Sequence, residues 1–171
     1  FMSPVLQKPF HFGADIVLHS VTKFLNGHSD VVGGVLVFQD EDLMKKVRAV
    51  LHYLGGTMDP HQAWLVHRGI KTLAVRMAHQ NASAQRLAEY LEGHDKIRRV
   101  YYPGLPSHPQ HELAVRQMTG FGGVVSFDVD RDLERTRAFL GGLQIPYLAP
   151  SLGGVESLVS HPATLSYYDL G

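Results

Sequence analysis

Residues 15–30 read DIVLHSVTKFLNGHSD, a short apolar run that leads into two hydroxyl residues, a lysine and a glycine turn. Three consecutive apolar residues, Ile16 to Leu18, indicate a strand buried on both faces, as in a parallel sheet. Ligands collect at the carboxyl ends of such strands. We therefore expect Lys23 at the end of a buried strand, beside a ligand site.

Two hydroxyl side chains precede this lysine. Ser20 and Thr22 are two positions apart, so on an extended backbone their hydroxyls point the same way, and both can donate to an anion such as a phosphate. Lys23 then points elsewhere, free to form an imine with a carbonyl cofactor or substrate. The alternative is an ordinary solvated surface lysine.

The motif around Lys23, residues 20–30, resembles the lysine motif of the pyridoxal-phosphate (PLP)-dependent enzymes of cysteine and methionine metabolism. That family includes cystathionine gamma-synthase, cystathionine gamma- and beta-lyases and methionine gamma-lyase. Further matches follow in order along the chain: FMSP (1–4), RGIKTL (68–73), YPGLPSHP (102–109) and SLGGVESL (151–158). Several long motifs in the right order make the resemblance specific.

The resemblance implies a set of site residues. Lys23 would carry pyridoxal 5'-phosphate covalently and move protons on the substrate, Ser20 and Thr22 would hold part of the phosphate, and Ser151 would lie beside the substrate carboxylate. On its own residues, the segment 151–154 is a glycine turn whose backbone amides can face an anion.

Three further groups near these motifs are expected to be structural. Glu156 and Ser157 are interpreted as stabilising the loop after Ser151, and His28 as fixing the turn after the lysine. A basic cluster is interpreted as solvated charge or a subunit contact, with a ligand role as the alternative; it comprises Arg68, Lys71 and Arg76.

The reaction implied is gamma-replacement, in which cysteine displaces the leaving group of an activated homoserine to give cystathionine. Residues 55–57, 117–127 and 145–151 look most like the plant-type gamma-synthases and their bacterial relatives. Many family members carry a glutamate where this chain has Pro150, so a cystathionine or methionine gamma- or beta-lyase stays open. A noncatalytic segment with an assembly role is the alternative from another class.

Composition narrows the class of protein and the kinds of partner and metal site that it can have. The 171 residues are 44% apolar and 19% charged, with a net charge of zero, which is typical of a globular protein. The Lys and Arg residues form no run, so nucleic acid and charged membranes are not expected as partners. Cysteine is absent, which excludes disulfides and thiolate metal sites, and the histidine spacings predict no metal site. We expect a protein of the cytoplasm or of a plastid.

The predicted fold class is α/β. Residues 1–72 are expected to be the C-terminal part of a large PLP-binding domain of the aspartate aminotransferase-like type (fold type I), and residues 73–171 a smaller α/β domain entered through a long connecting helix. The resemblance also implies a homotetramer, built as a dimer of dimers. The chain starts without Met and lacks the family's upstream ring-binding residues and downstream carboxylate-binding arginine, so we expect truncation at both ends.

Local patterns predict the individual elements. A second buried strand is expected over 33–38, and Asp40 is expected to cap an amphipathic helix over 41–54 that carries Glu41–Lys45 and Asp42–Lys46 pairs. The other expected elements are helices at 60–67, 71–91, 111–118 and 133–140 and strands at 97–101, 123–129 and 144–148.

Overall fold

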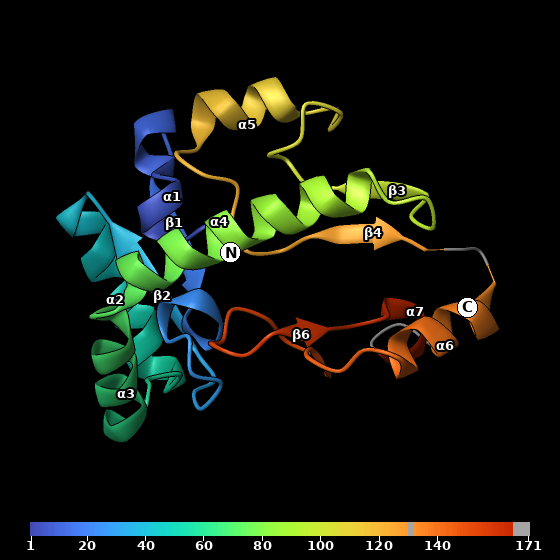
Figure 1. Ribbon diagram of the computed structural model, residues 1–171. Coiled ribbons are helices and arrows are strands. Elements are labelled where there is room, and N and C mark those ends of the chain that lie inside the picture. Colours follow the sequence, from blue (N-terminus) through green and yellow to red (C-terminus); the bar gives the residue numbers. More distant parts are fainter. Residues whose placement is uncertain (130–131, 166–171) are drawn as a thin grey trace.

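The computed structural model describes residues 1–129 and 132–165. The longest helix, α4 (Leu73–Glu92), runs through the middle of the molecule (Figure 1). The elements before it gather around its first turns, and the chain that follows it includes a strand pair along its second half. Because one helix touches both groups, it sets their relative position.

The first sheet is a two-stranded antiparallel pair. β1 (Ile16–Ser20) pairs with β2 (Gly34–Phe38), with Val17 opposite Val37. Val17 is 7% exposed, whereas Ile16 is 39% and Leu18 72% exposed. The expectation of a strand buried on both faces in a parallel sheet is therefore wrong for this chain, as is that of a buried strand over 33–38. Among the described residues β1 has one antiparallel partner, so side chains alternate between a packed and an open face.

The segment before β1 is more regular than a loop. It contains a one-turn helix, α1 (Ser3–Leu6), and a 3-10 turn, η1 (Pro9–Phe12). Both begin near a proline, which favours the first positions of a helix.

The two helices after β2 follow their sequence signals closely. α2 (Glu41–Leu54) starts where the Asp40 carboxylate accepts from Leu43 N at 2.8 Å, and it ends at Gly55, whose φ is +73°. Lys45 lies 3.0 Å from Glu41 and 3.7 Å from Asp42, so Asp42 pairs with Lys45 instead of the expected Lys46.

α3 (Pro60–Ile70) is capped by Asp59, which accepts from the amides of His61 and Gln62. It continues past the predicted end at residue 67. Helix ends depend on tertiary contacts as well as local signals.

The part of the chain after α4 forms two further two-stranded sheets. β3 (Arg99–Tyr101) pairs antiparallel with β4 (Ser126–Asp128), and β5 (Tyr147–Leu148) pairs parallel with β6 (Leu158–Val159). β3, β4 and β5 are shorter than predicted, and β6 was not predicted. They are accompanied by α5 (His111–Gln117), α6 (Leu133–Gly141) and α7 (Pro162–Leu165).

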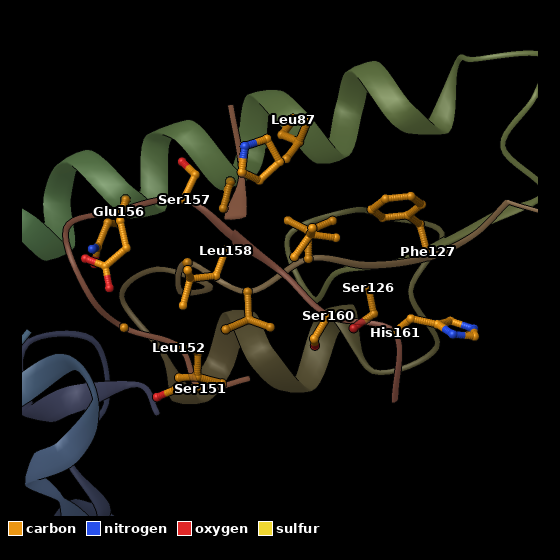
Figure 2. A pocket seen from close by; sticks show the side chains of 18 of the residues that line it. Leu87, Ser126, Phe127, Ser151, Leu152, Glu156, Ser157, Leu158, Ser160 and His161 are labelled. Atoms are coloured by element: carbon orange, nitrogen blue, oxygen red, sulfur yellow. The ribbon is translucent and has the colours of Figure 1, made fainter. Parts of the chain in front are cut away.

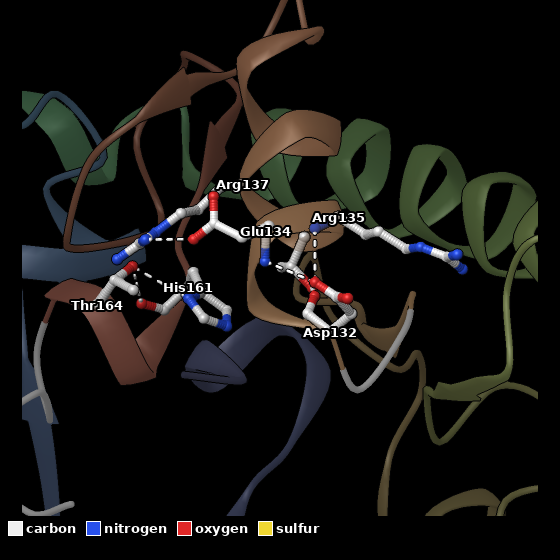
Figure 3. Close-up of polar contacts among 7 residues, drawn as sticks. Asp132, Glu134, Arg135, Arg137, His161 and Thr164 are labelled. Carbon is white, nitrogen blue, oxygen red and sulfur yellow. Dashed lines mark hydrogen bonds and ion pairs between the residues drawn. The ribbon is translucent and has the colours of Figure 1, made fainter.

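Figure 3 shows how α6 and α7 begin. The Asp132 carboxylate accepts from the amides of Glu134 at 2.8 Å and Arg135 at 3.1 Å. Arg137 pairs with Glu134 at 2.7 Å, and His161 Nδ1 lies 3.0 Å from Thr164 Oγ1. The caps compensate helix ends that would otherwise leave amides unsatisfied.

Three apolar clusters make up the core of the part of the chain that the structure describes. One packs the lysine turn against α3, with Val21, Leu25, Val31 and Val66. A second joins that turn to the start of α4, with Leu6, Phe24, Leu73 and Met77. The third lies along the rest of α4, with Ala84, Ala88, Leu91, Val100, Tyr102 and Leu105.

Tyr102 is the largest of the fully buried side chains. Its hydroxyl donates to Gly122 O at 2.9 Å, so burial leaves no unsatisfied polar atom there. Burial and the charge of Glu89 raise the pKa of Tyr102 to about 12. Within the described part of the chain, no helix has the length and apolar character needed to cross a bilayer.

Candidate active site

The lysine lies in a tight turn directly after β1. Residues Val21–Leu25 wind as a wide helical turn, η2, in which Lys23 alone leaves the helical region, with φ −97° and ψ −134°. Val21, Phe24 and Leu25 point into the core. Because these apolar residues anchor the turn, the half-buried Lys23 side chain projects from a fixed backbone.

The hydroxyl of Thr22 closes this turn onto the next strand. Thr22 Oγ1 accepts from Gly33 N at 2.9 Å and donates to Gly33 O at 3.3 Å. The backbone therefore bends after Ser20, and the expected extended run through Thr22 is not what the structure has. Residues 21–25 form a helical turn here because their apolar side chains pack in the core. The local spacing of residue types does not reveal those tertiary contacts.

Arg76 of α4 holds the end of the lysine turn. Its guanidinium donates to Phe24 O at 2.8 Å, Leu25 O at 3.3 Å and Gly69 O at 2.9 Å, and its Nε donates to Thr72 Oγ1 at 3.1 Å. These hydrogen bonds satisfy carbonyl groups that the short turn leaves without backbone donors. Burial lowers the pKa of Arg76 below its ordinary value.

Gly27 makes room for that guanidinium. A Cβ at this position would lie 2.1 Å from Arg76 Nη1, and its φ is +70°. The sequence interpretation of Arg76 as a solvated or subunit-contact charge is thus wrong, because its partners are backbone carbonyls of this chain. The one sequence signal was Gly27, a glycine within the lysine motif.

Residues 26–30 extend the lysine turn beyond η2 into a polar network. The buried Asn26 donates from Nδ2 to Asp30 Oδ1 at 2.6 Å, and His28 Nδ1 lies 2.6 Å from Asn26 O. α3 approaches closely here, since a Cβ on Gly69 would lie 2.3 Å from Asn26 O. These contacts agree with the structural role expected for His28.

The second part of the site comes from the loop after β5. Lys23 Nζ donates to Ser151 Oγ at 2.9 Å. Ser151 has a φ of +82°, a left-handed conformation that is uncommon for residues other than glycine. The structure therefore brings together two of the predicted site residues, Lys23 and Ser151, from opposite ends of the chain.

Gly153 lets this loop lie directly on the lysine turn. Its φ is +89°, and a Cβ there would lie 2.6 Å from Phe24 N and 2.9 Å from Lys23 C. Two more contacts hold the loop: Gln80 Nε2 donates to Gly154 O at 2.8 Å, and Ser29 Oγ donates to Glu156 Oε1 at 2.5 Å.

A cavity of about 850 Å³ opens beside the loop. It lies between α4, β4, α6 and the segment 151–163, and Figure 2 shows Ser151 and Glu156 at one end with Phe127 and His161 at the other. Its walls include Phe24 and Ser151 but not Lys23. The Lys23 amine thus lies next to this cavity and not inside it.

The groups around Lys23 fit an aldehyde cofactor that carries a phosphate. The lysine offers a primary amine, and none of the ion pairs found among the described residues includes it. Ser20 and Thr22 supply hydroxyls on either side of the bend that leads to it. An α/β fold with a lysine amine at the end of a strand corresponds to the class of enzymes that attach a carbonyl cofactor to lysine.

Comparison with known proteins identifies the family. The family model for Cys/Met metabolism PLP-dependent enzymes matches residues 1–171. The chain belongs to this family, whose members are enzymes that depend on pyridoxal phosphate, and the resemblance inferred from the sequence is confirmed.

Individual relatives include synthases and lyases. The chain is 54% identical over 170 residues to cystathionine gamma-synthase 1, chloroplastic, of Arabidopsis thaliana, covering 99% of this chain and 30% of that protein. It is 48% identical over 167 residues to cystathionine gamma-lyase of Bacillus subtilis (strain 168), covering 98% of this chain and 44% of that protein. The chain thus spans less than half the length of these relatives.

A solved structure shows the same fold. Cystathionine gamma synthase from Xanthomonas oryzae pv. oryzae, in complex with cystathionine, superposes with a TM-score of 0.95 at 48% identity. The match covers 98% of this chain and 43% of that one. The α/β fold of the PLP-dependent fold type I enzymes is therefore confirmed at the level of architecture.

Proposed function

We propose that this chain carries the reactive lysine of a cystathionine gamma-synthase. In that reaction the Cγ–O bond of an activated homoserine breaks, a bond forms between Cγ and the sulfur of cysteine, and the displaced acid leaves as the thiol loses its proton. The observation that carries the proposal is the Lys23 Nζ to Ser151 Oγ hydrogen bond of 2.9 Å. The 54% identity to the Arabidopsis gamma-synthase supports the choice of reaction.

The residues of the chain take separate parts in this reaction. Pyridoxal phosphate supplies an aldehyde for covalent attachment and a ring that withdraws electrons from the substrate Cα. Lys23 Nζ binds the aldehyde and, once released, takes the proton from the substrate Cα. Ser20 and Thr22 contribute to holding the phosphate.

The contribution of Thr22 to holding the phosphate would be limited, because its hydroxyl already bonds to both polar backbone atoms of Gly33. Ser151 orients the lysine amine through its Oγ and lies where the carboxylate of an amino-acid substrate would approach. Gly153 lets the loop that carries Ser151 lie directly on the lysine turn, since a Cβ there would lie 2.6 Å from Phe24 N.

A gamma-lyase of the same family is the second candidate. The 48% identity to the Bacillus subtilis gamma-lyase favours it. Pro150 stands directly before Ser151 and offers no carboxylate for proton transfer to the substrate.

A direct assay separates these candidates. The full-length protein is supplied with cysteine and with O-acetyl-, O-succinyl- or O-phosphohomoserine, and cystathionine is quantified against the α-keto acid released from cystathionine or methionine. Cystathionine formation supports the synthase, whereas keto-acid release alone overturns it in favour of the lyase.

Cofactor attachment tests the site itself. Borohydride reduction followed by peptide mapping should place pyridoxyl phosphate on Lys23, and Lys23→Ala should abolish both the label and the yellow colour. Lys71→Ala, an exposed lysine of the same chain, should change neither. A protein that stays colourless with added cofactor would instead support the noncatalytic assembly role.

Several further properties belong to the same proposal. Residues 1–72 would form part of the cofactor domain and residues 73–171 the smaller domain, with α4 connecting them. The assembly would be a homotetramer, and exposed apolar side chains such as Leu18 (72%), Tyr53 (87%) and Leu54 (79%) support burial against further protein. Sedimentation of the full-length protein tests the assembly. The location would be the cytoplasm or a plastid.

A further inference from the structure

Glu156 folds back from the loop of residues 151–157, here called the serine loop, onto the lysine turn. Its Oε1 accepts from Ser29 Oγ at 2.5 Å, a contact between residues 127 positions apart. Ser29 adopts a left-handed φ of +58°. The side chain therefore reaches the far end of the turn that begins before Lys23, at a point separate from the Lys23–Ser151 contact.

The carboxylate of Glu156 also lies against its own loop. A Cβ on Gly154 would come within 2.5 Å of Oε1 and 2.7 Å of Cδ, so a side chain there would displace the carboxylate. Hydrogen bonds from Ser29 and then from the backbone of Glu156 and Val155, together with the charge of His28, lower the pKa of Glu156. The carboxylate is thus a negatively charged centre that ties the loop to the lysine turn.

The loop needs such a tie because Ser151 is held in a costly conformation. A left-handed φ on a residue other than glycine persists only where the surroundings determine it. The described structure offers three side-chain hydrogen bonds to the loop, namely Lys23 with Ser151, Gln80 with Gly154, and Ser29 with Glu156. Leu152 also packs against the apolar cluster at the start of α4. The hydrogen bond between Lys23 and Ser151 is the contact that a reaction must break whenever the amine moves.

We propose that Glu156 is a positioning residue, which acts through Ser29 to hold the loop 151–157 on the lysine turn and so keeps Ser151 Oγ within reach of Lys23 Nζ. The contact preserves the place of Ser151 while the amine is engaged elsewhere. This role rests on the proposed function only for the catalytic use of Lys23 and Ser151. The hydrogen bond between Ser29 and Glu156 is itself a property of the fold.

Hydrogen exchange of the full-length protein tests the tie without any assay of activity. In Glu156→Ala and in Ser29→Ala, amides of residues 152–157 should exchange about tenfold faster, as expected when one contact that closes a local opening is lost. The double variant should exchange no faster than either single variant, because both remove the same contact.

The matched control is another serine–glutamate hydrogen bond of this chain, from Ser107 Oγ to Glu92. Glu92→Ala and Ser107→Ala should leave exchange in 152–157 unchanged. Unchanged exchange in Glu156→Ala and Ser29→Ala, or effects that multiply in the double variant, would overturn the proposal. Should Glu156→Ala fail to fold, Ser29→Ala decides the question alone.

Chemical labelling of Lys23 in the cofactor-free protein provides a second readout. Ser151→Ala removes the partner of the amine and should change the rate at which trinitrobenzenesulfonate modifies Lys23, relative to Lys71 in the same sample. Glu156→Ala should shift that rate in the same direction. If the unaltered protein makes no cystathionine, the proposed function fails, while exchange and labelling still decide the role of Glu156.

Discussion

The Nζ atom of Lys23 donates a hydrogen bond to the Oγ atom of Ser151 across 2.9 Å, joining residues 128 positions apart in the chain. One residue follows a strand at the start of the chain, and the other occupies a left-handed position in a loop near its end. Their contact makes the orientation of the amine depend on both ends of the molecule.

Removing the Ser151 hydroxyl tests that dependence. In the full-length enzyme, Ser151→Ala should lower kcat about tenfold or more, because a group that orients the reacting amine contributes at least one hydrogen bond to the transition state. The measurement is steady-state cystathionine formation at saturating substrate. Ser107→Ala, at an exposed serine outside the cavity, should retain full kcat, and an equal loss in both variants would contradict a specific role for Ser151.

Adding one methyl group at Gly153 should separate the loop from the lysine turn. The new Cβ would lie 2.6 Å from Phe24 N, and φ is +89°, so Gly153→Ala should lower the free energy of unfolding by about 1–3 kcal/mol. Urea denaturation provides the measurement. In Gly141→Ala the added Cβ meets nothing within 4 Å, and stability should stay the same or rise slightly.

Loss of Arg76 should loosen the lysine turn itself. Arg76→Ala leaves three backbone carbonyls without their charged donor, which should cost about 2–4 kcal/mol of unfolding free energy. Arg76→Lys should recover only part, because an ammonium cannot reproduce the guanidinium geometry. Thermal unfolding with Arg86→Ala, an exposed arginine of the same helix, gives the comparison, and equal effects of both alanine variants would refute the assignment.

Acid should release the serine loop through Glu156. The hydrogen bond from Ser29 and those from the backbone hold the folded pKa of Glu156 below its ordinary value of 4.5. Its contribution to loop closure is therefore complete above that value and is lost as the pH falls through the lowered folded value. Hydrogen exchange of residues 152–157, followed from pH 6 downwards, should show this step.

The acid step should vanish in Glu156→Gln, which keeps an oxygen acceptor but has no carboxyl proton to bind. His19 needs a separate control, because burial, and next the N-terminal charge, lower its pKa from 6.5. Its effect on global stability also appears as the pH falls, so His19→Gln should be measured alongside. A step that persists in Glu156→Gln would place the titrating group elsewhere.

Local sequence signals predicted the elements that local forces determine. Asp40, the charges that follow it and Gly55 define α2 at both ends, and the structure has the helix in those positions. The burial of β1 was predicted wrongly, because it depends on how many strands and layers surround Leu18.

The site was predictable only in part. The sequence motif named Lys23 and Ser151, yet no spacing could show that their side chains meet. Thr22 was placed on an extended backbone, whereas it lies in a coiled turn that the core stabilises. Arg76 was interpreted wrongly as a solvated or subunit-contact charge, because its partners are the carbonyls of Phe24 and Leu25, 52 and 51 positions away, which carry no signature in their side chains.

Arg76 and Gln80 are four residues apart on α4 and so lie on one face of the helix. Arg76 donates hydrogen bonds to the lysine turn, and Gln80 donates one to the serine loop. One face of α4 thus holds both halves of the site in a fixed relative position. The rise along the helix axis from Arg76 to Gln80 is about 6 Å. Inserting a single residue between them would rotate Gln80 by about 100° and put the two halves out of register, although every group that touches them would still be present.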